Sequence, residues 1–542
     1  MSGYISSTPV PPQQGGYGNP YVLLVGAILA GCLLVSWYTA SAKDDSREPP
    51  VLRPKFPVIG HLLGIMQLQG DYLNKLGSNT KWPIFTLKIL STKIYVITSP
   101  ELVQAVFRNA KTLSFDPITI LSSKRIFQMT DRAVKLTYDT SGEYGEKSQA
   151  LVHTVTKAMH AALQASPALF KTNSFALESF ASGLDDVGSE GKSVDLYDFI
   201  RHHFTIATAH ALYGPVNPIS EDKSLIQKLS DFDSQIGLLF MDILPWLTCR
   251  RGHRARSDFA KAYKRYYDQK NEIASSPLIL VRYNSLIAGG YTTDDLASFD
   301  IGIIMAATMN SNPGLFWLVS YIYSSPTLLA EIRAEIDAIT IHTGPTSQNT
   351  SREAQIDVTL LHSACPLLVS SWQETLRMRA ATIPSRIVTA DTLLSSTYLL
   401  KKGSVIQMPC QPMHTSTTTW GPSASTFSAT RFLPDTVSML NKDEKKKRKQ
   451  AFSPFGGGSV LCPGRYFASS EIMGVLAFLV AGFEIEDVRV LDAQLQVMSA
   501  QIKAPDGDVR VRIKRRKGWE GVRFKFESGS GEVGDALAFD QM

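Results

Sequence analysis

Residues 455–465 read Phe455-Gly-Gly-Gly-Ser-Val-Leu-Cys462-Pro-Gly464-Arg465, and this stretch says most about the fold of the chain. Three successive glycines before Cys462 let the backbone turn sharply and come close to a bound group. Pro463 suits the first position of a helix, and residues 466–480 then continue in a good helical pattern. The sequence therefore predicts a cysteine in a tight turn at the N-terminus of a long apolar helix.

Such a turn meets the needs of a cysteine thiolate that binds haem iron as an axial ligand. Backbone N–H donors lower the pKa of such a thiolate, and the positive end of the helix dipole faces it. The bound thiolate pushes electron density onto the iron and favours cleavage of the O–O bond. A buried structural cysteine in a glycine-rich turn is the alternative. Cys462 is our candidate iron ligand, and Phe455, Gly458 and Gly464 of its loop are candidate haem-binding residues.

The spacing Phe-x-x-Gly-x-x-x-Cys-x-Gly resembles the signature of the cytochrome P450 family. The resemblance covers roughly residues 57 to 525 and implies a single catalytic unit. It further implies a mainly α fold with a small β subdomain, and haem b buried beside the helix that follows Cys462. One departure is Val460, because the family often has an arginine or histidine there that contacts a haem propionate.

Composition and charge limit the class of protein. The chain has 542 residues, of which 44% are hydrophobic, so it can bury a large core. A net charge of +6 is too mild to argue for nucleic acid, but it suits an anionic membrane surface and an acidic electron-transfer partner. The five cysteines are scattered and show neither a disulfide framework nor zinc-site spacing, which favours a reducing compartment.

We expect five segments along the chain. Residues 1–20 form a disordered tail, and residues 21–42 form a single transmembrane anchor. Residues 43–60 form a proline-rich hinge. The catalytic domain follows over residues 61–525, and residues 526–542 form a flexible C-terminal tail.

The anchor sets the expected location of the protein. Tyr21 to Ala42 carries no charge and is long enough to span a bilayer, whereas a cleaved signal peptide would have a basic start and a shorter apolar core. Lys43 and Arg47 follow the span, and positive residues stay on the cytosolic side. We therefore expect a single-pass protein of the endoplasmic reticulum membrane with a cytosolic catalytic domain.

Four charged residues are expected to support the haem loop. Glu374 and Arg377 match the Glu-x-x-Arg of a P450 helix and share one helix face. The resemblance implies that Arg431 completes a buried Glu–Arg–Arg network with a structural role. Arg386 stands where the family often places an arginine on a haem propionate, and a guanidinium fork suits a carboxylate. A generic surface arginine is the alternative.

The segment expected above the haem departs from the usual family pattern. Residues 296–325 read as one long apolar helix, begun by acidic residues and kinked at Pro313. Most P450s carry an acid–alcohol pair in this helix for proton delivery, whereas this chain has Asn310 and Ser311. That pattern resembles the branch of sterol 7α-hydroxylases and prostacyclin synthase. Asn310 and Ser311 are our candidate catalytic residues; alternatively, Asn310 only satisfies the kinked backbone.

Residue patterns also predict a strand pair, a helix and two charged surface segments. Residues 83–89 and 93–98 alternate like paired strands, and residues 100–107 read as a helix. The basic cluster 250–256 is interpreted as a solvated face, with membrane contact as the alternative. The charged run 442–449 is interpreted as a flexible surface loop, with reductase docking as the alternative.

Two chemistries are compatible with these motifs. The favoured one is monooxygenation of a lipophilic, terpenoid or steroid-like substrate in secondary metabolism, with O₂ and with NADPH electrons delivered by NADPH–cytochrome P450 reductase. The other is a redox-neutral rearrangement of a peroxide, which needs neither reductase nor a proton relay. A scaffold without catalysis is the third possibility.

Overall fold

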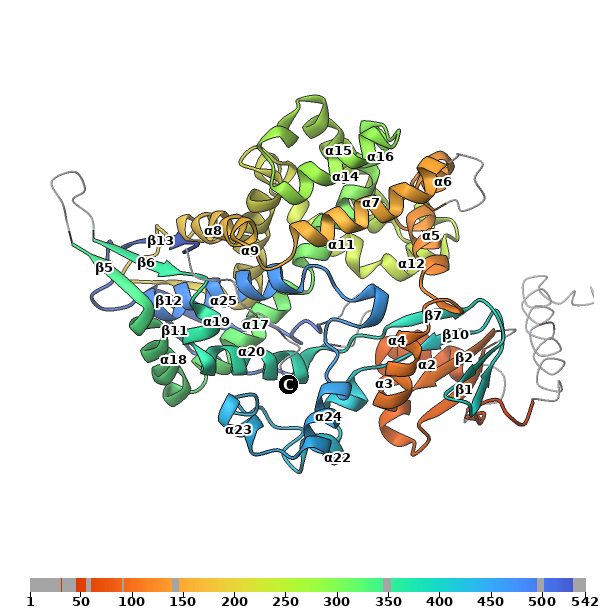
Figure 1. Cartoon of the computed structure of the whole chain (residues 1–542). Coiled ribbons are helices and arrows are strands. Elements are labelled where there is room, and N and C mark those ends of the chain that lie inside the picture. Colours follow the sequence, from red (N-terminus) through yellow and green to blue (C-terminus); the bar gives the residue numbers. More distant parts are fainter. Residues whose placement is uncertain are drawn as a thin grey trace, which may run out of the picture.

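The computed structural model describes residues 45–54, 60–89, 92–138, 146–344, 352–494 and 502–529, together with Gly31. Helices make up most of the described chain, and the strands form small sheets beside them (Figure 1). The predicted mainly helical architecture is confirmed. The predicted single β subdomain is too simple, since the described strands form four separate sheets. Apart from Gly31, the predicted anchor over 21–42 lies outside the described residues, as do residues 1–20 and 530–542 of the two predicted tails.

Long helices alternate with short helices and short strands along the chain. The helices of the first half are α2 (Gly60–Leu68), α3 (Gly70–Asn79), α4 (Pro100–Arg108), α5 (Asp116–Arg125), α6 (Asp131–Tyr138), α7 (Glu146–Ala162), α8 (Pro167–Ser182), α9 (Leu196–Tyr213), α10 (Pro218–Glu221), α11 (Leu225–Ser234), α12 (Ile236–Met241), α13 (Pro245–Thr248) and α14 (Arg250–Asp268). Those of the second half are η1 (Asn271–Ala274), α15 (Pro277–Ala288), α16 (Thr293–Thr308), α17 (Ser311–Tyr323), α18 (Pro326–Ile339), α19 (Leu361–Ala364), α20 (Pro366–Arg379), α21 (Gln411–His414), α22 (Thr417–Trp420), α23 (Pro434–Ser438), α24 (Lys442–Ala451), η2 (Gly458–Val460) and α25 (Arg465–Gly482). The strands are β1 (Ile84–Ile89), β2 (Thr92–Ile97), β3 (Leu113–Ser114), β4 (Lys192–Asp195), β5 (Thr340–Thr343), β6 (Glu353–Asp357), β7 (Ser385–Val388), β8 (Thr392–Leu394), β9 (Tyr398–Leu400), β10 (Val405–Gln407), β11 (Phe483–Glu486), β12 (Arg510–Arg515) and β13 (Arg523–Glu527).

The largest sheet has the strand order β1-β2-β10-β7-β3. Its first two strands pair antiparallel, as the alternation over 83–89 and 93–98 predicted. The hinge segment runs along the edge of this sheet, because Leu52 donates to the carbonyl of Thr86 at 2.9 Å and Thr86 donates to that of Pro50 at 2.8 Å. The described part of the hinge is therefore packed against the domain rather than free of it.

The long apolar helix predicted over 296–325 is two helices, α16 and α17. Thr292 begins α16 with a capping box to Asp295. The break falls at Met309 and Asn310, a few residues before the expected kink at Pro313. The physical reason is that a proline has no N–H to donate to the carbonyl four residues earlier, so the hydrogen-bond ladder is interrupted on its N-terminal side.

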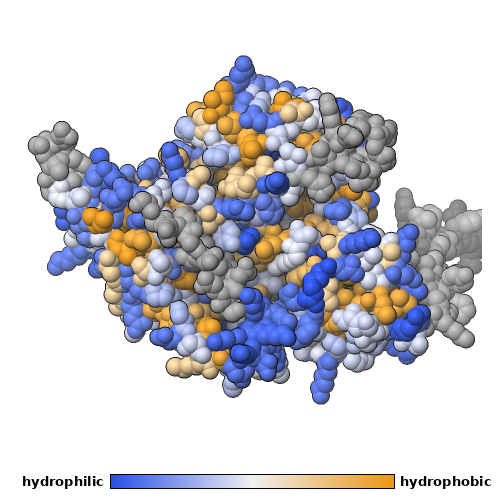
Figure 2. All heavy atoms as spheres, in the orientation of Figure 1, coloured by the Kyte–Doolittle hydropathy of each residue, from blue (hydrophilic) through white to orange (hydrophobic). Residues whose placement is uncertain are grey.

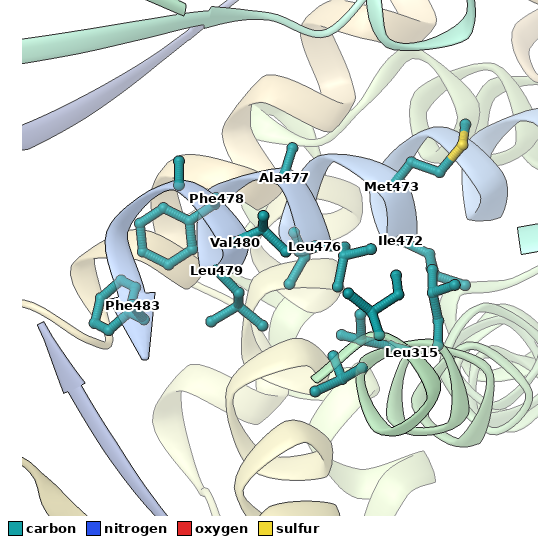
Figure 3. Close-up of a cluster of buried hydrophobic side chains, with 14 of the residues drawn as sticks. Leu315, Ile472, Met473, Leu476, Ala477, Phe478, Leu479, Val480 and Phe483 are labelled. Atoms are coloured by element: carbon teal, nitrogen blue, oxygen red, sulfur yellow. The ribbon is translucent and has the colours of Figure 1, made fainter. Parts of the chain in front are cut away.

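Helix α25 is the central helix of the largest core cluster. It starts at Arg465, directly after Cys462-Pro-Gly, as the sequence predicted. Its side chains Ile472 and Leu476 pack near Leu315 of α17 (Figure 3). Among the described residues, α25 is long and apolar enough to cross a membrane, yet 83% of it is buried inside the protein. It is therefore a core helix.

Two segment expectations need adjustment. The charged run 442–449 is not a loop: it forms α24, because Asn441 and Glu444 make a capping box and lysines are good helix formers. Strand β13 continues to Glu527, two residues past the expected end of the domain at 525. It pairs with β6, and its residue Phe526 is buried.

Candidate active site

The loop before Cys462 is pressed against helix α4. A Cβ added to Gly457 would lie 2.4 Å from the ring of Phe107, and one added to Gly458 would lie 2.7 Å from the carbonyl oxygen of the same residue. Gly458 also has a φ of +66°, which disfavours side chains. These two positions therefore require glycine, and the close packing on α4 sets the path of the loop.

The thiol of Cys462 sits at the N-terminus of α25. The backbone N–H of Cys462 donates to the carbonyl of Phe455 at 3.0 Å, and this hydrogen bond closes the loop. Burial raises the pKa of the thiol, whereas the backbone N–H groups of Gly464 and Arg465 and the charge of Arg465 lower it. We expected N–H donors to lower this pKa, and they are present, but burial of the thiol outweighs them. A thiolate at this position therefore needs a further positive partner, which a bound iron ion would supply.

Arg386 points toward the same loop from strand β7. Its side chain is only 2% exposed, and it donates to the carbonyls of Ser385 at 2.7 Å and Gly457 at 3.4 Å. The guanidinium also faces the rings of Phe107 and Phe115. In the described part of the chain, no carboxylate lies within ion-pair distance of Arg386. A buried guanidinium of this kind has an unused capacity for an anion.

Glu374, Arg377 and Arg431 lie together in one buried network. Arg377 binds both carboxylate oxygens of Glu374, at 2.7 and 2.8 Å, and Arg431 Nε lies 3.0 Å from the same two oxygens. Arg377 also donates to the carbonyls of His414 and Ala424. The network thus joins α20 to the segment that leads into the Cys462 loop.

Asn310 lies in the break between α16 and α17, and Ser311 is the first residue of α17. The Ser311 hydroxyl donates to the carbonyl of Ala307 at 2.8 Å, one turn earlier. Asn310 Oδ1 accepts the backbone N–H of Ile502 at 3.2 Å. Both candidate catalytic residues therefore make backbone contacts at the break, and Asn310 joins the helix to the C-terminal segment.

The comparison with known families decides the identity of this architecture. The cytochrome P450 family model matches residues 49–504, which is most of the chain. The chain belongs to the cytochrome P450 family.

Curated relatives narrow the class of P450. The chain is 30% identical to cytochrome P450 monooxygenase nodJ of Hypoxylon pulicicidum, over 94% of this chain and 98% of that protein. It is 32% identical to a cytochrome P450 monooxygenase of Gibberella zeae, over 90% and 92%. It is also 23% identical to cholesterol 7-alpha-monooxygenase of Cricetulus griseus, over 86% and 92%. This P450 is thus of the monooxygenase class, with fungal and sterol-hydroxylase relatives.

The residues of this P450 fit a haem-thiolate group. Cys462 would bind the iron, and the glycine loop leaves room for close approach of a flat ring. Arg386 would hold a propionate, which would satisfy its buried charge. Val460 is 37% exposed and apolar, so it makes no such contact.

Sequence reasoning missed two buried acids of this P450, Asp300 on α16 and Glu471 on α25. Asp300 lies on α16, but Arg282 and Tyr267 hold its carboxylate, and it is fully buried away from the break. Glu471 is the one acidic residue of α25 and is completely buried. A lone carboxylate in an otherwise apolar core helix was the available signal for it.

Proposed function

We propose that this P450 oxidises a lipophilic small molecule with a terpenoid or steroid-like skeleton, in secondary metabolite biosynthesis. It uses O₂ and two electrons from NADPH, delivered by NADPH–cytochrome P450 reductase. The observation that carries the proposal is the thiol of Cys462 in its glycine loop, to which the buried Arg386 donates through the carbonyl of Gly457. Haem bound there would supply O₂ activation, and the chain would supply the thiolate, the propionate contact and the substrate cavity.

The surface of α16 supports a lipophilic substrate. Ile303, Ala306 and Ala307 are not buried, and they lie on the helix expected above the haem. A polar substrate would leave its donors and acceptors unpaired against such a surface, and each unpaired group is costly. The name of the cholesterol 7-alpha-monooxygenase relative and those of the fungal monooxygenases also favour this substrate class.

An exposed apolar patch supports attachment to the endoplasmic reticulum membrane. The patch comprises the end of α12, the turn after it and α13. Its large apolar side chains are about half exposed or more: Met241, Ile243, Leu244, Trp246 and Leu247. Arg250 and Arg251 follow directly, so cationic groups flank the patch as they do in interfacial helices. The alternative interpretation of the 250–256 cluster, membrane contact, is the one we propose; Arg256 is the exception, since it is buried on the carbonyls of Arg125 and Ile126.

Helix α24 supports docking of an acidic reductase. Lys442, Lys446 and Lys449 are exposed on it, and hydrophilic atoms cover the surface over α22 and α24 in Figure 2. The chain runs from the end of α24 directly into the Cys462 loop. A positive surface close to the haem loop favours rapid association with a negatively charged electron donor.

A redox-neutral rearrangement is the second candidate. It is favoured by one observation: the break between α16 and α17 carries Asn310 and Ser311 in place of an acid–alcohol pair. In that case Asn310 would orient a peroxide oxygen, and no reductase would be needed.

Metabolite profiling of the source organism with and without this gene distinguishes monooxygenation from rearrangement. Monooxygenation is supported if the compound that accumulates is lighter than the lost product by one oxygen atom. If the two compounds are isomers, the rearrangement is the function instead. Cys462→Ser is the matched variant: it should abolish both the thiolate spectrum of the reduced, CO-bound protein and the activity, and retained activity would overturn the haem-thiolate assignment.

A further inference from the structure

The loop that carries Cys462 is held at its entrance by a buried histidine. The chain leaves α24 at Phe452, and the next residue, Ser453, is buried. The backbone N–H of Ser453 donates to Nε2 of His414 at 3.2 Å, and His414 is completely buried at the end of α21. A buried backbone N–H needs an acceptor, and here a side chain from a distant segment supplies it. The imidazole ring therefore sets where the loop begins.

Backbone hydrogen bonds continue from Ser453 to the cysteine. The carbonyl of Ser453 accepts the N–H of Gly456 at 3.1 Å, and this hydrogen bond closes the first turn of the loop. The carbonyl of Phe455, which lies inside that turn, accepts the N–H of Cys462 at 3.0 Å. A displacement of Ser453 would therefore pass through two successive backbone hydrogen bonds to the residue that carries the thiol.

The main chain of His414 is fixed by the buried charged network. The carbonyl of His414 accepts Arg377 Nη1 at 2.6 Å, and Arg377 is the residue that binds both carboxylate oxygens of Glu374. The N–H of His414 donates to the carbonyl of Cys410 at 2.9 Å. His414 thus contacts the network through its backbone and the cysteine loop through its ring, so it joins the two.

Two further side chains contact the loop entrance, but at other atoms. Thr382 Oγ1 donates to the carbonyl of Pro454 at 3.0 Å, and Cys410 Sγ lies 3.3 Å from Ser453 Oγ. Thr382 and Cys410 are both buried, and the N–H of Cys410 donates to the carbonyl of Thr382 at 2.9 Å. Neither side chain accepts the backbone N–H of Ser453. Loss of the imidazole acceptor would therefore leave that buried donor unpaired, which is costly.

The surroundings of His414 keep its ring in the state that can accept. An imidazole nitrogen accepts a hydrogen bond only when it carries no proton. Burial and the charge of Arg377 lower the pKa of His414 to about 3, and the carbonyl of Ala380 has a smaller, opposite effect. The ring is therefore neutral near pH 7, and the hydrogen bond from Ser453 places the ring proton on Nδ1 rather than Nε2.

We propose that His414 is a positioning residue for the haem-thiolate site, holding the entrance of the Cys462 loop through Nε2 so that the sulfur stays in place to bind iron. This rests on the proposed haem-thiolate function. His414 acts through Ser453 and contacts no reacting atom, so it is not a catalytic residue. Without the acceptor, the N–H of Ser453 has to find another partner. The loop entrance then shifts, and the sulfur of Cys462 moves with it.

The test compares three substitutions of His414 in the full-length holoenzyme. His414→Gln keeps an acceptor, because Oε1 of glutamine lies as many bonds from the backbone as Nε2 of histidine, whereas His414→Asn is too short and His414→Leu has no acceptor. H414L and H414N should lose the thiolate spectrum of the reduced, CO-bound protein about tenfold faster than the wild type, and H414Q within about twofold of it. The Fe–S stretching band in resonance Raman spectra should shift in H414L and H414N and stay in place in H414Q.

His61→Leu is the matched control. His61 is also a buried histidine, and its ring nitrogens lie 2.8 Å from the hydroxyl of Tyr72 and 2.8 Å from the carbonyl of Leu52. H61L thus removes buried hydrogen bonds of a histidine ring that has no contact with the cysteine loop. It should lower the free energy of unfolding in denaturant, but leave both the lifetime of the thiolate spectrum and the Raman band unchanged.

Three outcomes would overturn the positioning role alone. They are wild-type lifetimes in H414L and H414N, equal loss in H414Q and H414L, which would make the ring a packing group only, and a similar loss in H61L, which would mean that the spectrum reports overall stability. Failure of H414L and H414N to bind haem, with recovery in H414Q, would support the role. A wild type without a thiolate spectrum would overturn the haem-thiolate assignment itself, and the positioning role with it.

Discussion

The backbone N–H of Ile502 donates to Asn310 Oδ1 at 3.2 Å, so the C-terminal segment is joined directly to the break between α16 and α17. These residues are almost two hundred positions apart in the chain. The contact means that the C-terminal segment helps to hold the helix in its broken form. It also gives Asn310 a structural contact beside any role in oxygen chemistry.

Asn310→Ala removes the acceptor of this hydrogen bond. We expect the free energy of unfolding to fall by about 1 kcal/mol, because the N–H of Ile502 loses its partner. Haem content should stay unchanged while coupling, or rearrangement, is impaired. Asn310→Asp keeps an acceptor oxygen and is the matched control for stability. Loss of haem in N310A would show that Asn310 is a structural residue only.

Glu374→Gln should strongly destabilise the protein. It removes the carboxylate between Arg377 and Arg431 and leaves two buried guanidinium groups without a counter-charge, which we expect to lower the free energy of unfolding by about 3–5 kcal/mol. Denaturant unfolding and haem content measure the effect. The control is Glu486→Gln, since Glu486 pairs with Lys514 at the solvent-exposed surface and its loss should leave stability essentially unchanged. Equal effects of the two substitutions would contradict the network's structural role.

Arg386→Met should weaken haem binding. Among the described residues, no carboxylate lies within ion-pair distance of the buried guanidinium, so a haem propionate would be its direct counter-ion. Losing a charged hydrogen bond of about 1.5–3 kcal/mol corresponds to haem release roughly 10 to 100 times faster. Transfer of haem to an apo-globin acceptor measures the rate. Arg386→Lys keeps the charge without the guanidinium fork, so its rate of haem release should lie between those of the wild type and R386M. An unchanged rate in R386M would assign the propionate contact to another residue.

Trp246 should enter the lipid interface. In vesicles with brominated lipids, its fluorescence should be quenched, and Trp246→Phe should remove that component. The measurement is made in a Trp37→Phe background, because Trp37 lies within the predicted anchor. Trp82 is also exposed, at 42%, but lies outside the patch, so Trp82→Phe should leave the quenching unchanged. Quenching that survives W246F would place the membrane surface elsewhere.

Glu471 should make stability depend on pH. Its pKa is raised from 4.5 to about 8 by burial, so the folded protein holds a proton that the unfolded chain releases above pH 4.5. Its contribution is therefore fully present below pH 4.5 and is lost as the pH rises from there to about 8, by up to roughly 5 kcal/mol. Denaturant unfolding of wild type and E471Q across this range measures the difference. A constant difference between the two proteins would mean that Glu471 is ionised in the fold.

The local parts of the site were predictable because the chain itself sets their geometry. Cys462, its glycines and the start of α25 are neighbours in sequence, so residue types and spacing define the turn and the helix. The pairing of Glu374 with Arg377 follows in the same way from a spacing of three residues on a helix. The capping box of α24 is equally local, but the predicted loop over 442–449 was wrong, because the run of lysines was interpreted as a solvated loop.

Contacts between distant segments depended on packing. The sequence predicts an interrupted helix near Pro313, because proline lacks an N–H, but only the fold brings Ile502 to Asn310 and Thr208 to Glu471. Residue types and spacing along the chain are thus sufficient for the family, the cysteine loop and the lack of an acid–alcohol pair. Packing in three dimensions sets the surroundings of a buried carboxylate such as Glu471, because the protonation and partners of a buried acid depend on what lies around it in space, and periodicity along the chain does not specify this.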